Sequence, residues 1–159
     1  MDFQTNPVIC KYMVGLLPSG VVSVLEPTPG VGNLVRALNG YQVTAPSDFF
    51  QVVGSFDAVV MNPPFTPMEL GYRILYQTMQ MTDIIIALMP WLTIINSQKR
   101  TDDIKAYGLK SVTHLPRLAF PGSRVQTCIL ELRRGYCADP LFLTPIFADL
   151  KKSRISLVH

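Results

Sequence analysis

Residues 56–65 read Phe56-Asp57-Ala58-Val59-Val60-Met61-Asn62-Pro63-Pro64-Phe65. The first six form a hydrophobic run that is typical of a buried parallel strand. Two prolines then end the strand, because each lacks a backbone N–H and has a fixed φ. We therefore expect the Asn62 side chain and the Pro63 carbonyl to lie on a stiff turn, as a preset pair of hydrogen-bond acceptors.

Such a pair of acceptors suits group transfer to a nitrogen atom. An exocyclic amino or amide nitrogen shares its lone pair with a ring or a carbonyl group. Two acceptors that hold its N–H groups draw it toward tetrahedral geometry, so it becomes a nucleophile without a strong base. Phe65 offers a flat face to a planar substrate, a contact worth about 1–3 kcal/mol for a nucleobase. The alternative is that Asn62-Pro63-Pro64 is only a turn that follows a strand.

A second pattern lies upstream and predicts a strand, a glycine turn and a helix. Residues 21–25 are the strand, Glu26-Pro27-Thr28-Pro29-Gly30-Val31-Gly32 is the turn, and residues 33–38 are the helix. Glycines in such a turn let a ligand approach the backbone at the carboxyl edge of the sheet. Val35 occupies the place of the third glycine of the dinucleotide fingerprint, so a pyrophosphate site is not expected. The Glu26 carboxylate would repel phosphate but attract the ammonium group of an amino-acid-like cofactor.

The two motifs together resemble a known family. Glu26-Pro27-x-x-Gly30-x-Gly32, followed by Asn62-Pro63-Pro64-Phe65, is similar to the motif pair of S-adenosylmethionine-dependent amino-methyltransferases, above all the N6-adenine DNA methyltransferases. The resemblance implies that the cofactor is S-adenosyl-L-methionine. It also implies that Asn62, Pro63, Pro64 and Phe65 hold the acceptor amine, and that the cofactor is held by Phe3, Gln4, Thr5, Glu26, Pro27, Gly30, Gly32, Asp48 and Asn62.

Two further segments contribute to this resemblance. Residues 2–7, Asp-Phe-Gln-Thr-Asn-Pro, are similar to the Phe-x-Thr-Pro segment that closes over the cofactor, with Asn6 as an insertion. Asp48-Phe49-Phe50 resembles the Asp-Phe-Leu segment whose carboxylate accepts a hydrogen bond from the cofactor's adenine. Taken alone, Asp48 is equally typical of a turn before a strand.

The fold that the resemblance implies is α/β, a Rossmann-like class I methyltransferase sheet with helices on both faces. The sheet would be mostly parallel with an antiparallel edge strand, in the order 3-2-1-4-5-7-6. Residues 84–92 fit a buried central strand followed by a turn at Pro90. Residues 110–116 and 125–132 fit the last two strands, which form a hairpin at the sheet edge. The resemblance covers residues 2 to 134.

The sequence departs from the family pattern in two ways. Residues 41–47 contain no acidic residue to bind the cofactor ribose, and the helix between the second and third strands is missing. Asp48 could serve both roles, or the affinity for cofactor could be poor. The second departure is size, since 25 residues follow Arg134 and no separate target-recognition domain is expected in them. Residues 1–159 are therefore expected to form a single domain.

The composition is typical of a single globular domain. With 159 residues and 48% hydrophobic residues, the chain has enough apolar material for one sizeable core. The three cysteines lie in no metal or disulfide pattern, which favours a reducing cytoplasm and no metal site. Residues 84–92 are too short to span a membrane, and the N-terminus does not read as a signal peptide.

Charge is distributed unevenly along the chain. Residues 1–98 carry 3 basic and 6 acidic residues, a net charge of −3, and residues 99–159 carry 11 and 5, a net charge of +6. The basic half could neutralise nucleic-acid phosphates, or it could be an ordinary solvated surface. Its candidate contacts are Lys99, Arg100, Arg117, Arg124, Arg133, Arg134, Lys151, Lys152 and Arg154.

Three functions remain open at this point. The first is methyl transfer to adenine N6 in nucleic acid, most simply DNA. The second is a protein glutamine N5 methyltransferase, which uses the same Asn-Pro-Pro turn on an amide nitrogen. The third is a catalytically weak accessory methylase subunit. A methylase of this size implies a homo-oligomer, a separate target-recognition subunit, or low sequence specificity.

Overall fold

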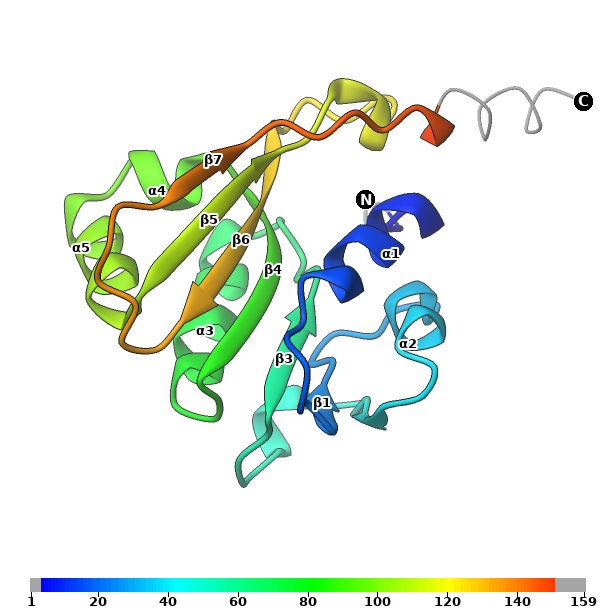
Figure 1. Ribbon diagram of the computed structural model, residues 1–159, viewed down its shortest axis with the longest axis vertical. Coiled ribbons are helices and arrows are strands. Elements are labelled where there is room, and N and C mark those ends of the chain that lie inside the picture. The colour runs from blue at the N-terminus through cyan, green and yellow to red at the C-terminus, as the bar shows by residue number, and fades with distance from the viewer. Residues whose placement is uncertain (1–3, 151–159) are drawn as a thin grey trace, which may run out of the picture.

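A computed structural model describes residues 4–150 of the protein. Within these residues one sheet is built first from strands interspersed with helices and then from three successive strands with no α-helix between them (Figure 1). The strands are β1 Ser23–Leu25, β2 Gln42–Thr44, β3 Ala58–Met61, β4 Ile84–Pro90, β5 Leu109–His114, β6 Thr127–Arg133 and β7 Leu141–Leu143. The helices are α1 Pro7–Gly15, α2 Asn33–Ala37, α3 Met68–Met79, α4 Leu92–Ile95 and α5 Gln98–Tyr107, and Phe49–Gln51 and Arg117–Ala119 form short 3₁₀ turns.

The strand order across the sheet is β2-β1-β3-β4-β6-β5-β7. Strands β2, β1, β3 and β4 pair in parallel, β6 is antiparallel to both β4 and β5, and β7 is parallel to β5. This confirms the predicted α/β class with a mostly parallel sheet. The β5–β6 hairpin lies at the expected side of the sheet, but β7 pairs in parallel with β5 outside it. The antiparallel strand β6 is therefore internal, between β4 and β5, and is not the edge strand that was predicted.

The predicted order 3-2-1-4-5-7-6 is wrong at the other side of the sheet. The described residues form no third strand beyond β2, where the order requires one. After β2 the chain forms a 3₁₀ turn at Phe49–Gln51, in which the Asp48 side chain accepts a hydrogen bond from the Phe50 N–H at 3.1 Å and caps the turn.

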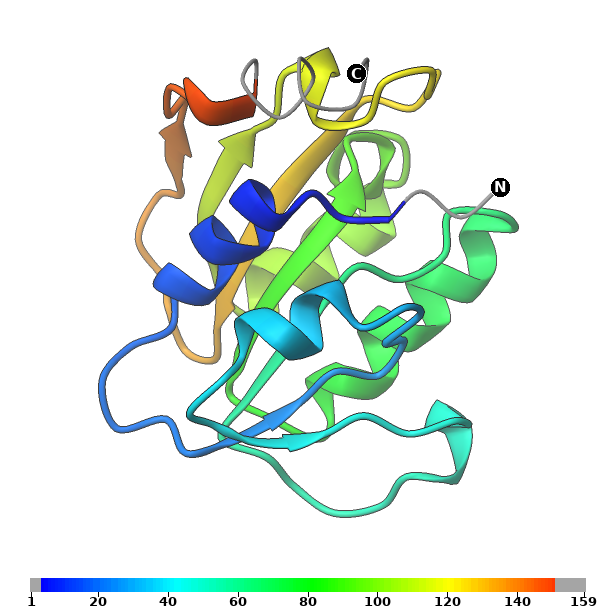
Figure 2. The same cartoon turned by 90° about the vertical axis from the view of Figure 1, so that its right-hand side faces the viewer.

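Helices cover both faces of the sheet, and α1 and α2 stand side by side on one face (Figure 2). Successive side chains of a central strand point to opposite faces of the sheet, so each central strand contributes to the hydrophobic core on both faces. In β3, Val59 and Met61 pack with α3 and α5, whereas Ala58 and Val60 pack with α1 and α2. Since β3 is buried on both faces, its end at Asn62 is held firmly in place. Among the described residues, no helix is long and apolar enough to cross a membrane.

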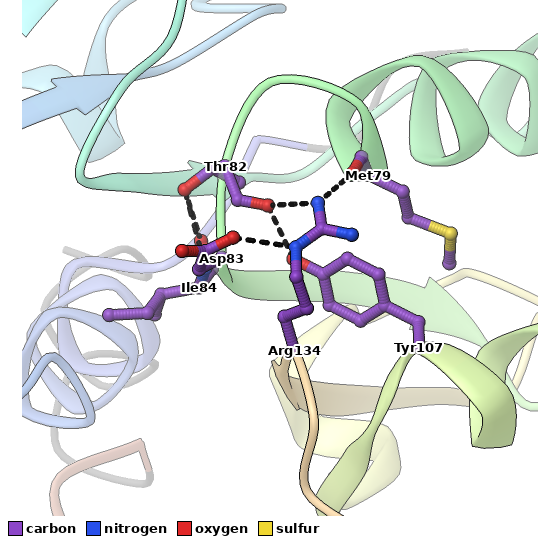
Figure 3. Close-up of polar contacts among 6 residues, drawn as sticks. All are labelled: Met79, Thr82, Asp83, Ile84, Tyr107 and Arg134. Atoms are coloured by element: carbon purple, nitrogen blue, oxygen red, sulfur yellow. Dashed lines mark hydrogen bonds and ion pairs between the residues drawn. The ribbon is translucent and has the colours of Figure 1, made fainter.

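An arginine ties elements together at the end of the sheet where β4 begins (Figure 3). Arg134, just after β6, donates to Asp83 Oδ1 at 2.6 Å and to the carbonyl oxygens of Thr82 and Met79. Its guanidinium lies 4.8 Å from the centre of the Tyr107 ring, and the Tyr107 hydroxyl donates to Thr82 O at 2.6 Å. The arginine thereby joins α3, β4, α5 and β6 at the edge opposite Asn62.

Candidate active site

A cavity of about 500 Å³ opens at the carboxyl ends of β1 and β3, a common ligand position in α/β sheets. Its volume lies in the usual range for small-molecule sites. It brings together segments that are far apart in the sequence. The lining residues are Gln4, Thr5, Glu26, Pro27, Thr28, Pro29, Gly30, Asn33, Leu34, Pro46, Ser47, Asp48, Phe49, Phe50, Asn62, Pro63, Pro64, Phe65, Leu70 and Ile74.

The Asn62 side chain is held by the N-terminal segment. Asn62 Nδ2 donates to Thr5 Oγ1 at 2.7 Å, and Thr5 is 4% exposed. The Asn62 backbone carbonyl accepts from the Thr28 hydroxyl at 3.3 Å. Because the amide nitrogen faces Thr5, the amide oxygen points to the opposite side of the planar group. Side chain and backbone of Asn62 are thus both fixed by residues of other segments.

Helix α3 lies directly against the turn that follows Asn62. A Cβ atom built on Gly71 would lie 2.9 Å from the Pro64 carbonyl oxygen and 4.0 Å from Pro63 Cγ. Real Cβ atoms essentially never approach an oxygen so closely, so the absent side chain allows this contact. Gly71 is buried, and its position sets the place of the Pro63-Pro64 backbone.

The N-terminal segment is anchored on both sides of Thr5. Asn6 caps α1 with its side chain, which accepts from Val8 N at 2.8 Å, and Pro7 occupies the first turn. The Thr5 carbonyl accepts from Asn33 Nδ2 at 2.8 Å. Asn6, the insertion in the sequence pattern, therefore starts a helix while Thr5 still reaches Asn62.

Glu26 is the buried carboxyl group of the cavity. It is 1% exposed, and its Oε1 accepts from the Thr28 backbone N–H at 2.8 Å. Burial raises the pKa of Glu26 from 4.5 to about 8, although its hydrogen bonds with Thr28 act in the opposite direction. Burial, and then the nearby Glu26 carboxylate, raise the pKa of the Cys10 thiol to about 12. A cationic ligand group beside Glu26 would favour the ionised carboxylate.

The glycine turn shapes the rim of the cavity. Gly30 has φ +53° and Gly32 has φ +88°, backbone conformations that favour glycine. The Gln4 side chain packs over Gly30, 3.5 Å from the position that a Cβ atom on this glycine would occupy. Gly32 does not line the cavity, because its N–H closes the turn on Pro29 O at 2.8 Å and its carbonyl accepts from Arg36 N at 2.9 Å.

Asp48 lines the cavity together with its neighbours Phe49 and Phe50. No carboxylate stands at the end of β2, which finishes at Thr44 and continues through Ala45 and Pro46. Glu26 and Asp48 are the carboxylates of the cavity wall in the described residues. The sequence indicated that no acidic residue follows the second strand, and the described cavity has none at that position.

Most of the sequence-predicted site residues come together in this cavity. Phe3 lies outside the described residues, and Gly32 stands behind the wall. Sequence reasoning missed Thr28 and Asn33, whose side chains fix Asn62 and Thr5, and it missed the wall residues Leu70 and Ile74. Thr28 lies within the glycine turn and Asn33 directly follows it, so the turn was the sequence signal that could have found both residues. Leu70 and Ile74 carried none, because they resemble any apolar helix residues.

Several basic residues of the second half of the chain are engaged within the protein. Lys99 pairs with Asp103 at 2.7 Å, and Lys110 and Arg133 lie 3.3 and 3.4 Å from the buried Glu131 carboxylate. Arg100 donates to carbonyl oxygens of α4, and Arg134 pairs with Asp83. Lys151, Lys152 and Arg154 lie outside the described residues. Arg117 and Arg124 remain as exposed cations of the loop between β5 and β6, at the edge of the sheet that holds the cavity.

Comparison with known proteins finds similarity in fold but not in sequence. No family model matches the sequence, and no curated protein matches it in sequence. A modification subunit of a proposed type I restriction enzyme from Vibrio vulnificus YJ016 superposes with a TM-score of 0.70 at 13% identity, over 99% of this chain and 52% of that one. The fold is that of class I methyltransferases.

Two other structures agree. A proposed class I S-adenosylmethionine-dependent methyltransferase from Listeria monocytogenes has a TM-score of 0.68 at 17% identity, over 97% of this chain and 70% of that one. The methyltransferase subunit of the Streptococcus thermophilus type I restriction-modification system has a TM-score of 0.65 at 12% identity, over 97% and 52%. The chain thus spans about half the length of the two type I subunits.

Proposed function

We propose that the protein is an S-adenosylmethionine-dependent methyltransferase that acts on an exocyclic amino nitrogen, adenine N6 in DNA. One observation carries the proposal. The Asn62 amide is fixed by Thr5 at the wall of a cavity whose buried carboxyl group is Glu26. An amide acceptor beside a cavity for a cationic cofactor is the arrangement that methyl transfer to nitrogen needs.

The residues of the cavity fit the cofactor. Glu26 offers a buried carboxylate to the ammonium group of the methionine part, and Asp48 offers a carboxylate to the amino group of the adenine part. The apolar side chains of Phe49, Leu70 and Ile74 also line the cavity. When bound, S-adenosyl-L-methionine would supply an electrophilic methyl group on a sulfonium. Because no carboxylate follows β2, we infer that the cofactor's ribose is held less firmly than its methionine and adenine parts.

The turn at Asn62 would position the acceptor. The Asn62 amide oxygen and the Pro63 carbonyl accept from the two N–H groups of the target amine, and Phe65 stacks on the base. Thr5 and Thr28 keep these acceptors in place, and Gly71 lets α3 support the turn from behind. The rate enhancement then comes from orientation and from fixed dipoles. A base within a duplex must first be flipped out, at a cost of a few kcal/mol.

We also propose that the chain acts as one methyltransferase domain and that target selection comes from a second copy or a separate subunit. Type I modification subunits among the similar structures support this, because one of these structures describes the complex assembly of a type I system. Buried Cys10 and Cys128, both free thiols, agree with a cytoplasmic location.

The test is transfer of labelled methyl from S-adenosyl-L-methionine to duplex DNA, single-stranded DNA, RNA and a glutamine-containing protein substrate. Product nucleosides are separated afterwards, and the Asn62→Ala variant is the control. We expect label in N6-methyladenine with the wild type alone. Label in protein glutamine would replace the nucleic-acid proposal by the amide one. Cofactor binding with no transfer to any acceptor would favour an accessory subunit.

A further inference from the structure

Three aromatic rings gather on the surface beside the candidate site. The ring of Trp91 lies 6.1 Å from that of His114 and 6.1 Å from that of Phe142, measured between ring centres. His114 is exposed, Phe142 is 64% exposed, and Trp91 is half-buried. A protein gains little stability from rings that remain in water, and an exposed aromatic cluster is a common sign of a binding surface.

The cluster lies at the same edge of the sheet as Asn62. Trp91 directly follows β4, and His114 ends β5, so both stand at carboxyl ends of strands. Phe142 pairs with Val112 in the register of β5 and β7 and points to the same face as His114. Strands lie about 4.8 Å apart, so the four intervals from β3 to β7 span roughly 19 Å. The rings thus lie along the row of strand carboxyl ends, on the side toward β7, and the Asn62 turn stands at the β3 end of this span.

Positive charge accompanies the rings. The Trp91 backbone N–H donates to Gln126 O at 2.9 Å, which joins the cluster to the loop between β5 and β6. When the Gln126 amide is turned so that its oxygen and nitrogen exchange places, its oxygen accepts from Arg117 Nε at 3.0 Å and Nη2 at 2.8 Å. Arg117 and Arg124, both exposed, belong to this loop. Exposed rings and exposed arginines at the carboxyl ends of neighbouring strands match the chemistry of single-stranded nucleic acid, in which bases stack and phosphates are neutralised.

We propose that Trp91, His114 and Phe142 form a stacking surface for unpaired bases of a nucleic-acid strand, with Arg117 and Arg124 facing its phosphates. The strand would run along the sheet edge, from a target base at Asn62 to flanking bases at the rings. This inference rests on the proposed nucleic-acid substrate and adds to it that the bases next to the target are unpaired. A stacking surface of this kind reads no base edges, so it gives affinity without sequence preference.

The chain provides its own reporter, because Trp91 is its single tryptophan. An oligothymidylate of about ten nucleotides, within the range that small single-strand sites cover, is titrated into the protein while Trp91 emission is recorded. Binding of a labelled copy is followed by anisotropy. We expect quenching that saturates, and a dissociation constant that rises steeply with salt. Blunt duplex of equal length should quench much less.

Two neighbouring variants separate stacking from folding. Phe142→Ala removes one ring, and the expected loss is about 5- to 100-fold in affinity for the oligothymidylate. Leu141→Ala is the matched control, since Leu141 is 54% exposed on the same strand and points to the other face. Its affinity should equal that of the wild type. Equal loss in both variants, or no loss in Phe142→Ala, would overturn the stacking surface.

The remaining outcomes distinguish this inference from the proposed function. Methyl transfer to single-stranded DNA without quenching of Trp91 would reject the stacking surface and leave the methyltransferase proposal intact. Quenching without transfer to any nucleic acid would support the surface and count against the proposed reaction. Trp91 emission that changes with protein concentration and not with oligonucleotide would show that a second copy covers the rings, which also rejects the inference.

Discussion

Thr5 Oγ1 and Asn62 Nδ2 lie 2.7 Å apart although 57 residues separate them in sequence. This hydrogen bond fixes the rotation of the Asn62 amide, and the Thr5 backbone is itself held by Asn33. The turn after β3 therefore does not define the acceptor pair alone. The site is complete only when the N-terminal segment is docked on the glycine turn.

Replacing Asn62 by alanine should remove transfer and preserve the fold. The side chain contributes an acceptor to the target amine but little to the core, since Asn62 is half-buried. We expect methyl transfer to fall by at least about 100-fold, as for the loss of one preorganised dipole, with cofactor binding within a few-fold of wild type. Calorimetric titration with S-adenosyl-L-methionine measures the affinity for the cofactor. Equal activity in the variant would mean that the turn is merely structural.

Replacing Thr5 by valine tests the docking of the N-terminal segment. Valine keeps the shape of threonine and removes the hydroxyl, so Asn62 loses the group that orients it. We expect kcat to fall by up to about 100-fold, the cost of a misplaced reacting group. Thr5→Ser retains the hydroxyl and should recover most of the rate. A serine variant as slow as the valine variant would point to packing instead of the hydrogen bond.

Replacing Gly71 by alanine should displace the turn. A Cβ would meet the Pro64 carbonyl at 2.9 Å, and overpacking of this kind costs about 1–3 kcal/mol. The gain of about 1 kcal/mol in helix propensity partly offsets this cost, so stability alone will change little. Transfer should fall sharply. Gln77→Ala, an exposed change on the same helix, is the control and should leave both quantities unchanged.

Glu26 should make stability depend on pH. Burial raises its pKa in the folded protein to about 8, above the ordinary 4.5. Between these values the folded protein holds a proton that the unfolded chain has released, so the free energy of unfolding falls as pH rises through this window. Thermal melts across this window should therefore show a falling Tm, and Glu26→Gln should flatten the profile. Glu69→Gln, on the exposed face of α3, controls for the loss of one carboxylate.

The arginine at the opposite edge should matter for stability and not for chemistry. Arg134→Met removes the bonds to the Met79 and Thr82 carbonyls and to Asp83 (Figure 3). Because the side chain is about half exposed, we expect a loss near the lower end of about 1–3 kcal/mol. Asp83→Asn breaks only the exposed ion pair and should cost less than about 1 kcal/mol. Denaturant unfolding measures both, and transfer rates of the folded variants should match the wild type.

Local features of the site could be predicted from the sequence. The run ending at Met61 is buried on both faces, the prolines end it, and Gly30 and Gly32 require positive φ, so each pattern follows from a few adjacent residues. Strand β7 could not be predicted, because its three residues, two of them exposed, owe their pairing to β5. The bond between Thr5 and Asn62 was not predicted, since neither residue alone indicates its partner.

The start of α1 shows a different limit. Asn6 followed by Pro7 is a recognisable helix start, with a capping side chain and a residue that lacks a backbone donor. The likeness of this segment to a cofactor-closing motif obscures that local signal. The prediction of a third strand is wrong for the opposite reason. The resemblance implies a strand beyond β2, whereas the residues around Asp48 indicate only a turn.

Both outer strands of the sheet, β2 and β7, are three residues long. A neighbouring molecule that extended the sheet at either side would gain only a few main-chain hydrogen bonds, too few to repay the ordering of a new strand. Edge-to-edge growth into fibres is thereby disfavoured within the described chain, even though Leu141 and Phe142 present apolar groups to water. Concentrated samples should remain dispersed enough for the solution spectroscopy that these experiments require.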